Sequence, residues 1–188
     1  AVGDGTLDVG VSGRGLKPDE VAKGLSVALT LQTPFVLVTS DKRPNGLART
    51  EVAAFYRNAK AAWADGTPLR PVLRPKSDSD TIVMSELFPG WEAAAEDARK
   101  RPEVATAATD QDNADVAERI PGSLTGMTLL QFNTEQRRLR LVAIDGVEPS
   151  LGAFEAGSYP FEKKLFVVVT GQPNATRDRF LAFLRSAE

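Results

Sequence analysis

The stretch LRPVLRPKSDSDTIVMSELF, residues 69–88, contains a strand, a polar loop and a helix in that order. Leu69 to Leu73 is short and apolar, which is typical of a buried strand. Residues 74–81 are polar, and residues 82–88 carry the apolar side chains of a helix that Pro89-Gly90 ends. A strand that leads into a helix through a polar loop is the building unit of α/β proteins.

The same alternation continues on both sides of this stretch. Further strands are expected at residues 6–12, 25–31, 34–40, 104–108, 123–130, 139–144 and 165–170. Further helices are expected at residues 51–62, 91–101 and 110–119, with short ones near Pro18 and at the C-terminal end. Strands and helices that alternate along the whole chain predict the α/β class.

Two helix starts have residues typical of N-caps. Thr50 precedes the helix predicted at residues 51–62, and Asn174 precedes the last helix. In that last helix Phe180, Leu181 and Leu184 are expected to point toward the core, because they recur at helical spacing.

The composition excludes several kinds of chemistry. The chain has 188 residues, of which 42% are hydrophobic and 26% charged, as in an ordinary soluble globular protein. The formal net charge of −2 argues against a protein that binds nucleic-acid phosphates. The absence of cysteine and histidine excludes disulfides, Cys/His zinc sites and Ser-His or Cys-His nucleophiles. No apolar run approaches the roughly 18 residues of a membrane span.

The loop from Arg74 to Thr81 is the strongest candidate for a binding site. An arginine at a strand end and the free N–H groups of a helix start suit an oxyanion, and hydroxyls in the same loop would add donors. The candidate ligand residues here are Arg74, Ser77, Ser79, Asp80 and Thr81. A second interpretation stays open: Ser79 or Asp80 only caps the helix, and Arg74 is a solvated strand end.

A second candidate is the glycine loop at Ser12-Gly13, where a strand ends. Glycine allows the backbone to approach a ligand closely, and Ser12 could donate its hydroxyl, but a plain turn explains the same pattern. The acidic residues from Asp110 to Glu118 lack the spacing of a calcium loop, and acids are stabilised at a helix start in any case.

The order of the motifs resembles that of phosphate-type solute-binding proteins of ABC transporters, in the type 2 periplasmic-binding-protein superfamily. Residues 5–17 resemble the family's G-x-x-D-I-G stretch, and Arg74 to Thr81 falls where the family has its R-x-x-G-S-G-T anion loop. Five further segments match in order: residues 33–40, 47–63, 120–126, 144–150 and Tyr159-Pro160 before the strand at 165.

This resemblance implies two α/β lobes, each with a mixed sheet flanked by helices, that close over a small anionic ligand. Residues 1–40 with 136–188 would form lobe 1, and residues 41–135 would form lobe 2. Ser12 and Gly13 from the first lobe and the loop at residues 74–81 from the second would bind the ligand. The protein would need no cofactor and would dock on a membrane ABC permease. It would be exported to the periplasm or cell exterior, although no signal peptide is visible in the chain.

The chain departs from the family in three ways. Family members have a βαβ segment before the stretch matched by residues 5–17, so the first lobe is expected to be incomplete, with a homodimer or a domain swap covering it. Gly13 stands where phosphate binders often have an aspartate. Asp78 and Asp80 replace glycine-like positions in a loop that is one residue longer, and their carboxylates oppose a dianion.

Two other functions remain as alternatives. The same fold serves as the ligand-sensing effector domain of regulators, which would account for a chain without a visible export signal. The third interpretation is an enzyme. Without histidine or cysteine it would need a pair of catalytic carboxylates, and no pattern in the sequence places two carboxylates on opposite sides of a cleft. Binding without catalysis is therefore the leading expectation.

Overall fold

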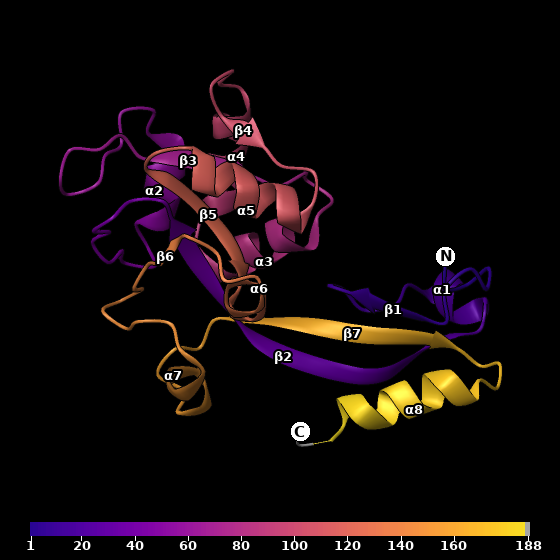
Figure 1. The fold of residues 1–188 in the computed structure, drawn as a ribbon. Helices are drawn as coiled ribbons and strands as arrows, with labels where there is room; N and C mark the ends of the chain where they lie inside the picture. The colour runs from indigo at the N-terminus through magenta and orange to yellow at the C-terminus, as the bar shows by residue number, and fades with distance from the viewer. Residues whose placement is uncertain (187–188) are drawn as a thin grey trace. The chain divides into compact units, whose positions relative to one another are not determined.

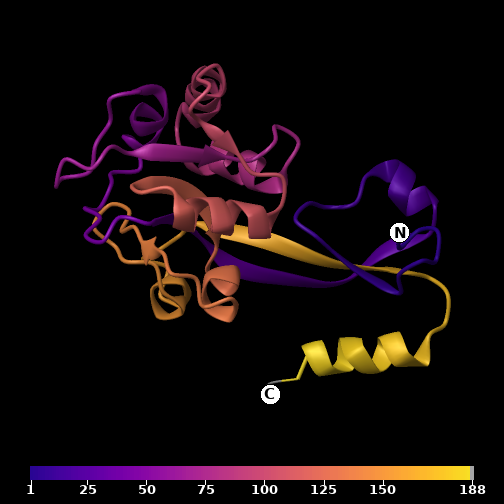
Figure 2. The same ribbon diagram turned by 45° about the horizontal axis from the view of Figure 1, so that its top comes forward.

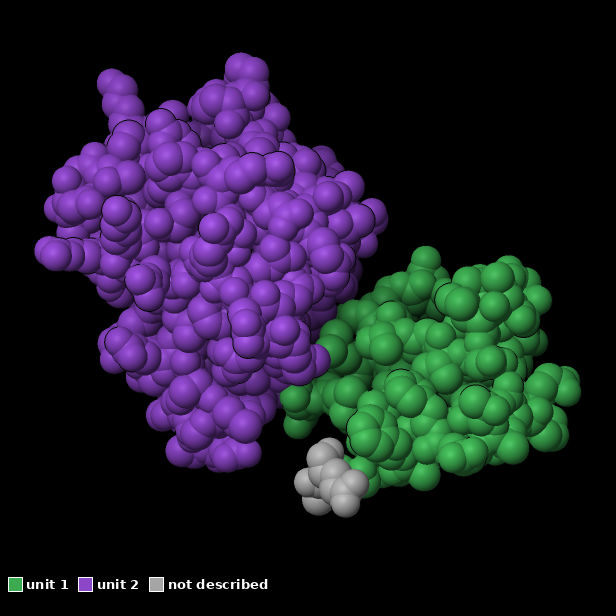
Figure 3. All heavy atoms as spheres, in the orientation of Figure 1, with its two compact units in different colours: residues 1–32, 164–188 green, residues 33–163 purple. Residues whose placement is uncertain are grey.

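A computed structural model describes residues 1–186, and the chain divides into two compact units. Unit 1 is formed by residues 1–32 and by the chain from Lys164 onward, and unit 2 by Thr33–Lys163; Figure 3 colours them separately. These bounds differ from the expected lobes, 1–40 with 136–188 and 41–135, and that division into binding lobes stays a prediction.

Unit 2 is built on a mixed sheet. The second half of β2 (Leu25–Thr39) pairs antiparallel with β5 (Ser123–Thr128), with Phe35 opposite Thr128, and with the short β6 (Arg140–Leu141). β5 pairs parallel with β3 (Arg70–Leu73), and β3 pairs parallel with β4 (Ala105–Thr106). The half of β2 inside unit 2 is buried throughout, as expected for an apolar strand covered on both faces.

Helices flank this sheet, as Figure 1 shows. α3 and α5 pack against β5, α4 packs against β3, and α2 lies on α4. Their bounds, with two shorter helices, are α2 (Val52–Arg57), α3 (Ser79–Leu87), α4 (Trp91–Arg99), α5 (Asp110–Arg119), α6 (Leu129–Thr134) and α7 (Leu151–Glu155). Trp63 and Trp91 are both buried in this core.

Unit 1 is a small sheet with a helix on it. β1 (Val9–Ser12) pairs antiparallel with β7 (Glu162–Thr170), and β7 lies next to β2 in the strand order (Figure 1 and Figure 2). α1 (Pro18–Ala22) follows β1, and α8 (Ala175–Leu184) follows β7. The core of this unit is small, with Val167, Val169 and Leu181 buried at its centre.

Several predicted strands have different bounds in the structure. The strands expected at 25–31 and 34–40 form one strand, because the fixed φ of Pro34 fits extended backbone and the next N–H, of Phe35, donates to Phe161 O (3.0 Å). The strand expected at 123–130 ends at Thr128, whose side chain accepts from the N–H of Gln131 (3.1 Å) and caps α6. The strand expected at 139–144 is only the two-residue β6.

Two details of the predicted helices are wrong. The helix expected at 51–62 spans Val52–Arg57, and its N-cap position is Glu51, not Thr50. Asn174 does cap α8, through its Oδ1 and the N–H of Arg177 (2.9 Å), and Leu181 is buried. Phe180 is 46% exposed, because it precedes Leu181 by one residue and so points about 100° away around the helix.

The chain's two tyrosines, Tyr56 and Tyr159, are both buried in unit 2. The hydroxyl of Tyr159 donates to Phe35 O (3.1 Å), and that of Tyr56 lies 3.5 Å from Leu124 O. Burial raises the pKa of both phenols well above the ordinary value, because the charged form would lose its hydration.

We therefore expect the two tyrosines to ionise only when the protein unfolds. Above the unfolded pKa of about 10, the unfolded chain releases protons that the folded chain keeps, so the free energy of unfolding falls as pH rises. In an alkaline titration, the tyrosinate absorbance and the loss of far-UV circular dichroism should coincide. Tyrosinate absorbance that appears while the circular dichroism is unchanged would contradict this.

Candidate functional site

The candidate site lies where β3 and β4 end. These strands are parallel, with Leu73 opposite Thr106, and the N–H of Ala107 donates to Leu73 O (2.8 Å). The loops that follow both strands therefore leave the same edge of the sheet, and α3 and α5 begin there. Helix N-termini present unpaired N–H groups and a positive dipole end, and this edge is where open α/β sheets bind ligands.

Side chains cap both helices. Asp78 caps α3, since its Oδ1 accepts from the N–H of Asp80 (2.8 Å). The interpretation that Ser79 or Asp80 caps α3 is wrong, because both already lie inside the helix while Asp78 has the extended backbone of a cap. Thr109 caps α5 in a reciprocal pair with Asp112.

Arg74 is buried at the centre of this edge, with 6% of its surface exposed. Its Nη2 donates to Asp78 Oδ2 (2.6 Å) and to Asp110 Oδ1 (2.8 Å), and its Nη1 donates to Ala107 O (3.0 Å). Its Nε is buried and has no hydrogen-bond partner among the described residues. Arg74 is therefore not a solvated strand end: it is a buried cation whose partners come from its own loop and from the segment between β4 and α5.

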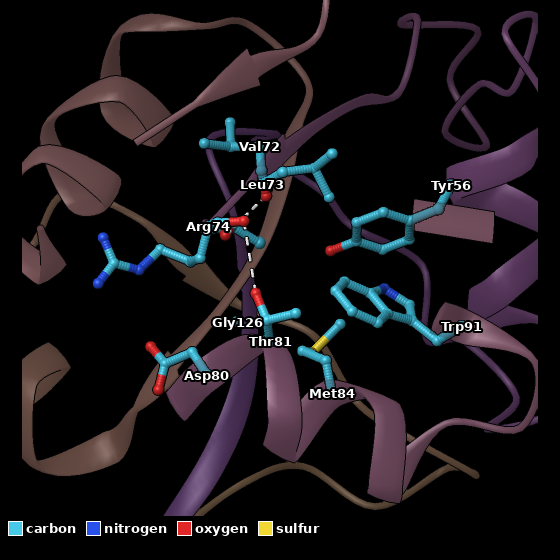
Figure 4. A pocket seen from close by; sticks show the side chains of 10 residues that line it. Tyr56, Val72, Leu73, Arg74, Asp80, Thr81, Met84, Trp91 and Gly126 are labelled. Atoms are coloured by element: carbon cyan, nitrogen blue, oxygen red, sulfur yellow. Dashed lines mark hydrogen bonds between the residues drawn. The ribbon is translucent and has the colours of Figure 1, made fainter. Parts of the chain in front are cut away.

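The backbone of the loop is fixed from two sides. Thr81 Oγ1 donates to Pro75 O (2.9 Å), and the guanidinium of Arg99, on α4, donates to Arg74 O (2.5 Å). Figure 4 shows the guanidinium of Arg74 directed away from the rings of Tyr56 and Trp91, on the side where the carboxylate of Asp80 lies. The position of the cation is thus set before any ligand arrives.

Asp80 and Lys163 form a buried ion pair. Each residue is less than a tenth exposed, and Lys163 comes from the start of β7, far along the chain from α3. Burial raises the pKa of the Asp80 carboxyl, while the Lys163 ammonium opposes this shift and the nearby carboxylates of Asp110 and Asp78 add to it.

The site as a whole carries excess negative charge. Asp78, Asp80 and Asp110 have oxygens within 4.8 Å of one another, and Arg74 and Lys163 are the two cations paired with them. The spacing of the three carboxylates would suit a metal ion, but each of them already accepts from Arg74 or Lys163. An ion would have to displace these cations, so the cluster is best described as an internally paired charge network.

The structure brings together part of the predicted set. Arg74, Asp80 and Thr81 share the edge just described, Ser79 is the first residue of α3, and Ser77 is exposed in the preceding turn. Ser12 and Gly13 belong to unit 1: Ser12 Oγ donates to Arg14 O (2.8 Å) and accepts from Arg14 N (3.2 Å), at the end of β1. Their part in ligand binding stays a prediction.

Sequence reasoning left three charged residues out of the predicted site: Asp110, Lys163 and Asp78, which was named only as a carboxylate that opposes a dianion. Asp110 had been interpreted only as an acid at a helix start. Its contact with Arg74 depends on the parallel pairing of β3 with β4, and the short 104–108 stretch before it was the available signal. Lys163 carries no local signal, because its partner Asp80 lies 83 residues away in the sequence.

Two hollows adjoin this loop inside unit 2. The smaller, of about 10 Å³, lies among Arg74, Tyr56 and Trp91 and has room for about one water. The larger, of about 430 Å³, lies between α3 and α4, and its lining includes the Lys76–Glu96 ion pair.

A family model described as a PBP superfamily domain matches residues 1–188, the whole chain. The chain belongs to the PBP superfamily. This agrees with the predicted fold class and with the resemblance to periplasmic binding proteins, and the mixed sheet flanked by helices is the architecture expected from them. No curated protein matches the sequence of this PBP-superfamily chain.

Several solved structures share the fold of this PBP-superfamily chain. One is a Clostridium perfringens protein described as a phosphate ABC transporter substrate-binding protein with phosphate bound. It is 16% identical in sequence, with a TM-score of 0.75, and the match covers 99% of this chain and 76% of the Clostridium chain. An ABC-type phosphate transport receptor from Vibrio cholerae is 12% identical, with a TM-score of 0.56 and coverage of 99% and 77%. Drosophila muscle GluRIIB in complex with glutamate is 10% identical, with a TM-score of 0.58 and coverage of 98% and 64%. At such identities the likeness shows the fold alone.

Within residues 1–186, none of the helices has the length and apolar character that crossing a membrane requires.

Proposed function

We propose that this chain is the solute-binding component of an ABC uptake system and that it captures a small oxyanion. The observation that supports this most directly is the buried guanidinium of Arg74 at the edge where α3 and α5 begin. A positioned guanidinium beside helix N-termini is a suitable receptor for an oxyanion, since the donors are already oriented and need no ordering on binding.

The solved relatives support the anionic class of ligand without selecting its identity. The Clostridium perfringens protein was solved with phosphate and the Drosophila receptor with glutamate, so one fold accommodates both a phosphate and a carboxylate. The solved phosphate-binding relatives are described as transport and binding proteins. They favour capture over catalysis, and uptake over the ligand-sensing alternative.

Within the site, we assign the charge to Arg74 and the neutral donors to the start of α3. Ser77 and Ser79 would offer hydroxyls, together with the N–H groups of the loop. The Thr81 hydroxyl already donates to Pro75 O, so its role is to hold the loop in place. Asp80 is paired with Lys163, and would have to exchange this partner before it could accept a proton from a ligand.

The partner and the compartment belong to the same proposal. An uptake component works outside the cytoplasmic membrane and delivers its ligand to a membrane permease. The predicted homodimer or domain swap is a separate matter, and the molecular mass of the protein in solution tests it directly.

Arg74→Ala should weaken binding of the best oxyanion by at least about tenfold, which is about 1.4 kcal/mol, because a charge-assisted donor is lost. The measurement is calorimetric titration with inorganic phosphate, sulfate and acetate. Arg70→Ala is the matched control, since Arg70 is an exposed arginine on the same strand that donates to Pro121 O.

Far-UV circular dichroism shows whether both variants fold. If the folded Arg74 variant binds as tightly as the unchanged protein, Arg74 does not hold the ligand. If the unchanged protein binds none of the three anions, the proposed function is wrong.

A further inference from the structure

We infer that the Asp110 carboxylate binds Arg74 at the position where the anionic group of the ligand binds. We further infer that the ligand, which displaces Asp110, is a small monoanionic carboxylate. This inference rests on the proposed function, and it names the class of oxyanion that the site takes. It also gives Asp110 the part of an internal competitor that sets specificity.

The three acceptors around Arg74 are not equally replaceable. The acceptor at Ala107 is its backbone carbonyl, and the N–H of the same residue donates to Leu73 O, so this part of the backbone is fixed. Asp78 is mostly buried, and the same side chain caps α3. Asp110 is 52% exposed, and Thr109 and Asp112 cap its helix without it. Asp110 is therefore the partner that a solute can replace without disturbing either helix.

The group that Asp110 presents to Arg74 is itself a carboxylate. Its Oδ1 lies 2.8 Å from Nη2, an ordinary length for a charge-assisted hydrogen bond. A solute carboxylate that replaces it would keep the same acceptor type at the same nitrogen. Among residues 1–186, Arg74 Nη1 donates only to Ala107 O, so its second N–H is available for the other carboxylate oxygen.

The local charges favour a monoanion over a dianion. When Asp110 turns away, Arg74 and Lys163 remain against Asp78 and Asp80, so the immediate surroundings of the guanidinium carry no net charge. A bound monoanion would then give the site one excess negative charge, as Asp110 does now, whereas a dianion such as hydrogen phosphate or sulfate would give it two. Like charges at such distances repel strongly when they are partly buried.

A competitor attached to the protein lowers the apparent affinity of the ligand. If Asp110 occupies Arg74 about nine-tenths of the time, only about a tenth of the molecules are ready to bind, and the apparent affinity falls about tenfold. Removing the Asp110 carboxylate should therefore raise the apparent affinity by the same factor, and a carboxylate from solution should then bind Arg74 in its place.

The test compares Asp110→Ala with Asp115→Ala, which removes an equal charge from an equally exposed position of α5; Asp115 pairs with Arg137 and takes no part in the cap of the helix. Each variant and the unchanged protein are titrated with acetate, inorganic phosphate and sulfate at constant ionic strength, by calorimetry and by thermal denaturation. We expect Asp110→Ala to bind acetate at least about tenfold more tightly than the unchanged protein does, and more tightly than it binds either dianion. Asp115→Ala should behave as the unchanged protein.

The outcomes separate this inference from the proposed function. Equal acetate binding in the two variants overturns the role of Asp110, even if the unchanged protein binds an anion through Arg74. Tighter binding of phosphate or sulfate than of acetate by Asp110→Ala overturns the monoanion assignment. A gain of acetate binding in Asp110→Ala alone supports the inference, even if the unchanged protein captures nothing. Asp110→Asn, which keeps the side-chain shape, serves if the alanine variant fails to fold, with the same expected order of affinities.

Discussion

Asp80→Asn should lower the free energy of unfolding by about 3–5 kcal/mol, the cost of leaving one member of a buried ion pair without its partner. In the folded protein Lys163 is 4% exposed, and Asp80 is its charged partner. Asparagine has nearly the same shape, so the loss comes from the unbalanced ammonium and not from a cavity. Urea denaturation at neutral pH, followed by far-UV circular dichroism, measures the effect.

The double variant Asp80→Asn with Lys163→Met separates the pair from other effects. With the ammonium replaced by an apolar side chain of similar length, no buried charge is left over, and most of the stability should return. The two single substitutions should each cost more than the double one. If the double variant loses the sum of the two single losses, the residues do not act as a pair.

Gly122→Ala should destabilise the protein by about 3 kcal/mol, because it combines backbone strain with a collision. Gly122 has a φ of +71°, and an added Cβ would lie 2.3 Å from Pro68 O and 2.9 Å from Thr67 Cγ2. The carbonyl of the same glycine accepts from the indole N–H of Trp63 (3.0 Å) and from Arg70 N (2.8 Å). A shift of this backbone would therefore disturb the start of β3.

Gly66→Ala is the control for the strain alone. Gly66 has a φ of +88°, but nothing lies within 4 Å of the position that a Cβ would take. This variant should lose only about 1–2 kcal/mol, the cost of the left-handed conformation for a residue with a side chain. Equal losses in the two variants, measured by urea denaturation, would mean that the contact with Pro68 is relieved at little cost.

The sequence predicted most of the secondary structure because that information is local. The helix at 110–119 has the predicted bounds, the strand–loop–helix of residues 69–88 is present, and Asn174 caps α8. The bounds that were missed depend on neighbours. Only the actual pairing shows that β2 continues through Pro34 and that Thr128 ends one strand and caps the next helix.

The sequence located the loop of the candidate site, but it did not show how the charged residues of the site pair with one another. A basic residue followed by a hydroxyl-rich helix start identified Arg74. That its guanidinium is already held by Asp110 follows from the side-by-side pairing of two strands, a contact 36 residues apart in the sequence. Such long-range pairing decides whether an arginine is available to a ligand, and residue type alone does not reveal it.

The two units differ in how much of the chain must exist before each can fold. Unit 2 is one uninterrupted segment, Thr33–Lys163, so the ribosome delivers everything it needs before the remaining chain appears. Unit 1 pairs β1 with β7, and Val9 meets Val169 only after the whole segment between them has been made. Domains fold as units while the chain emerges. Residues 1–32 therefore cannot complete their sheet until all of unit 2 has been made.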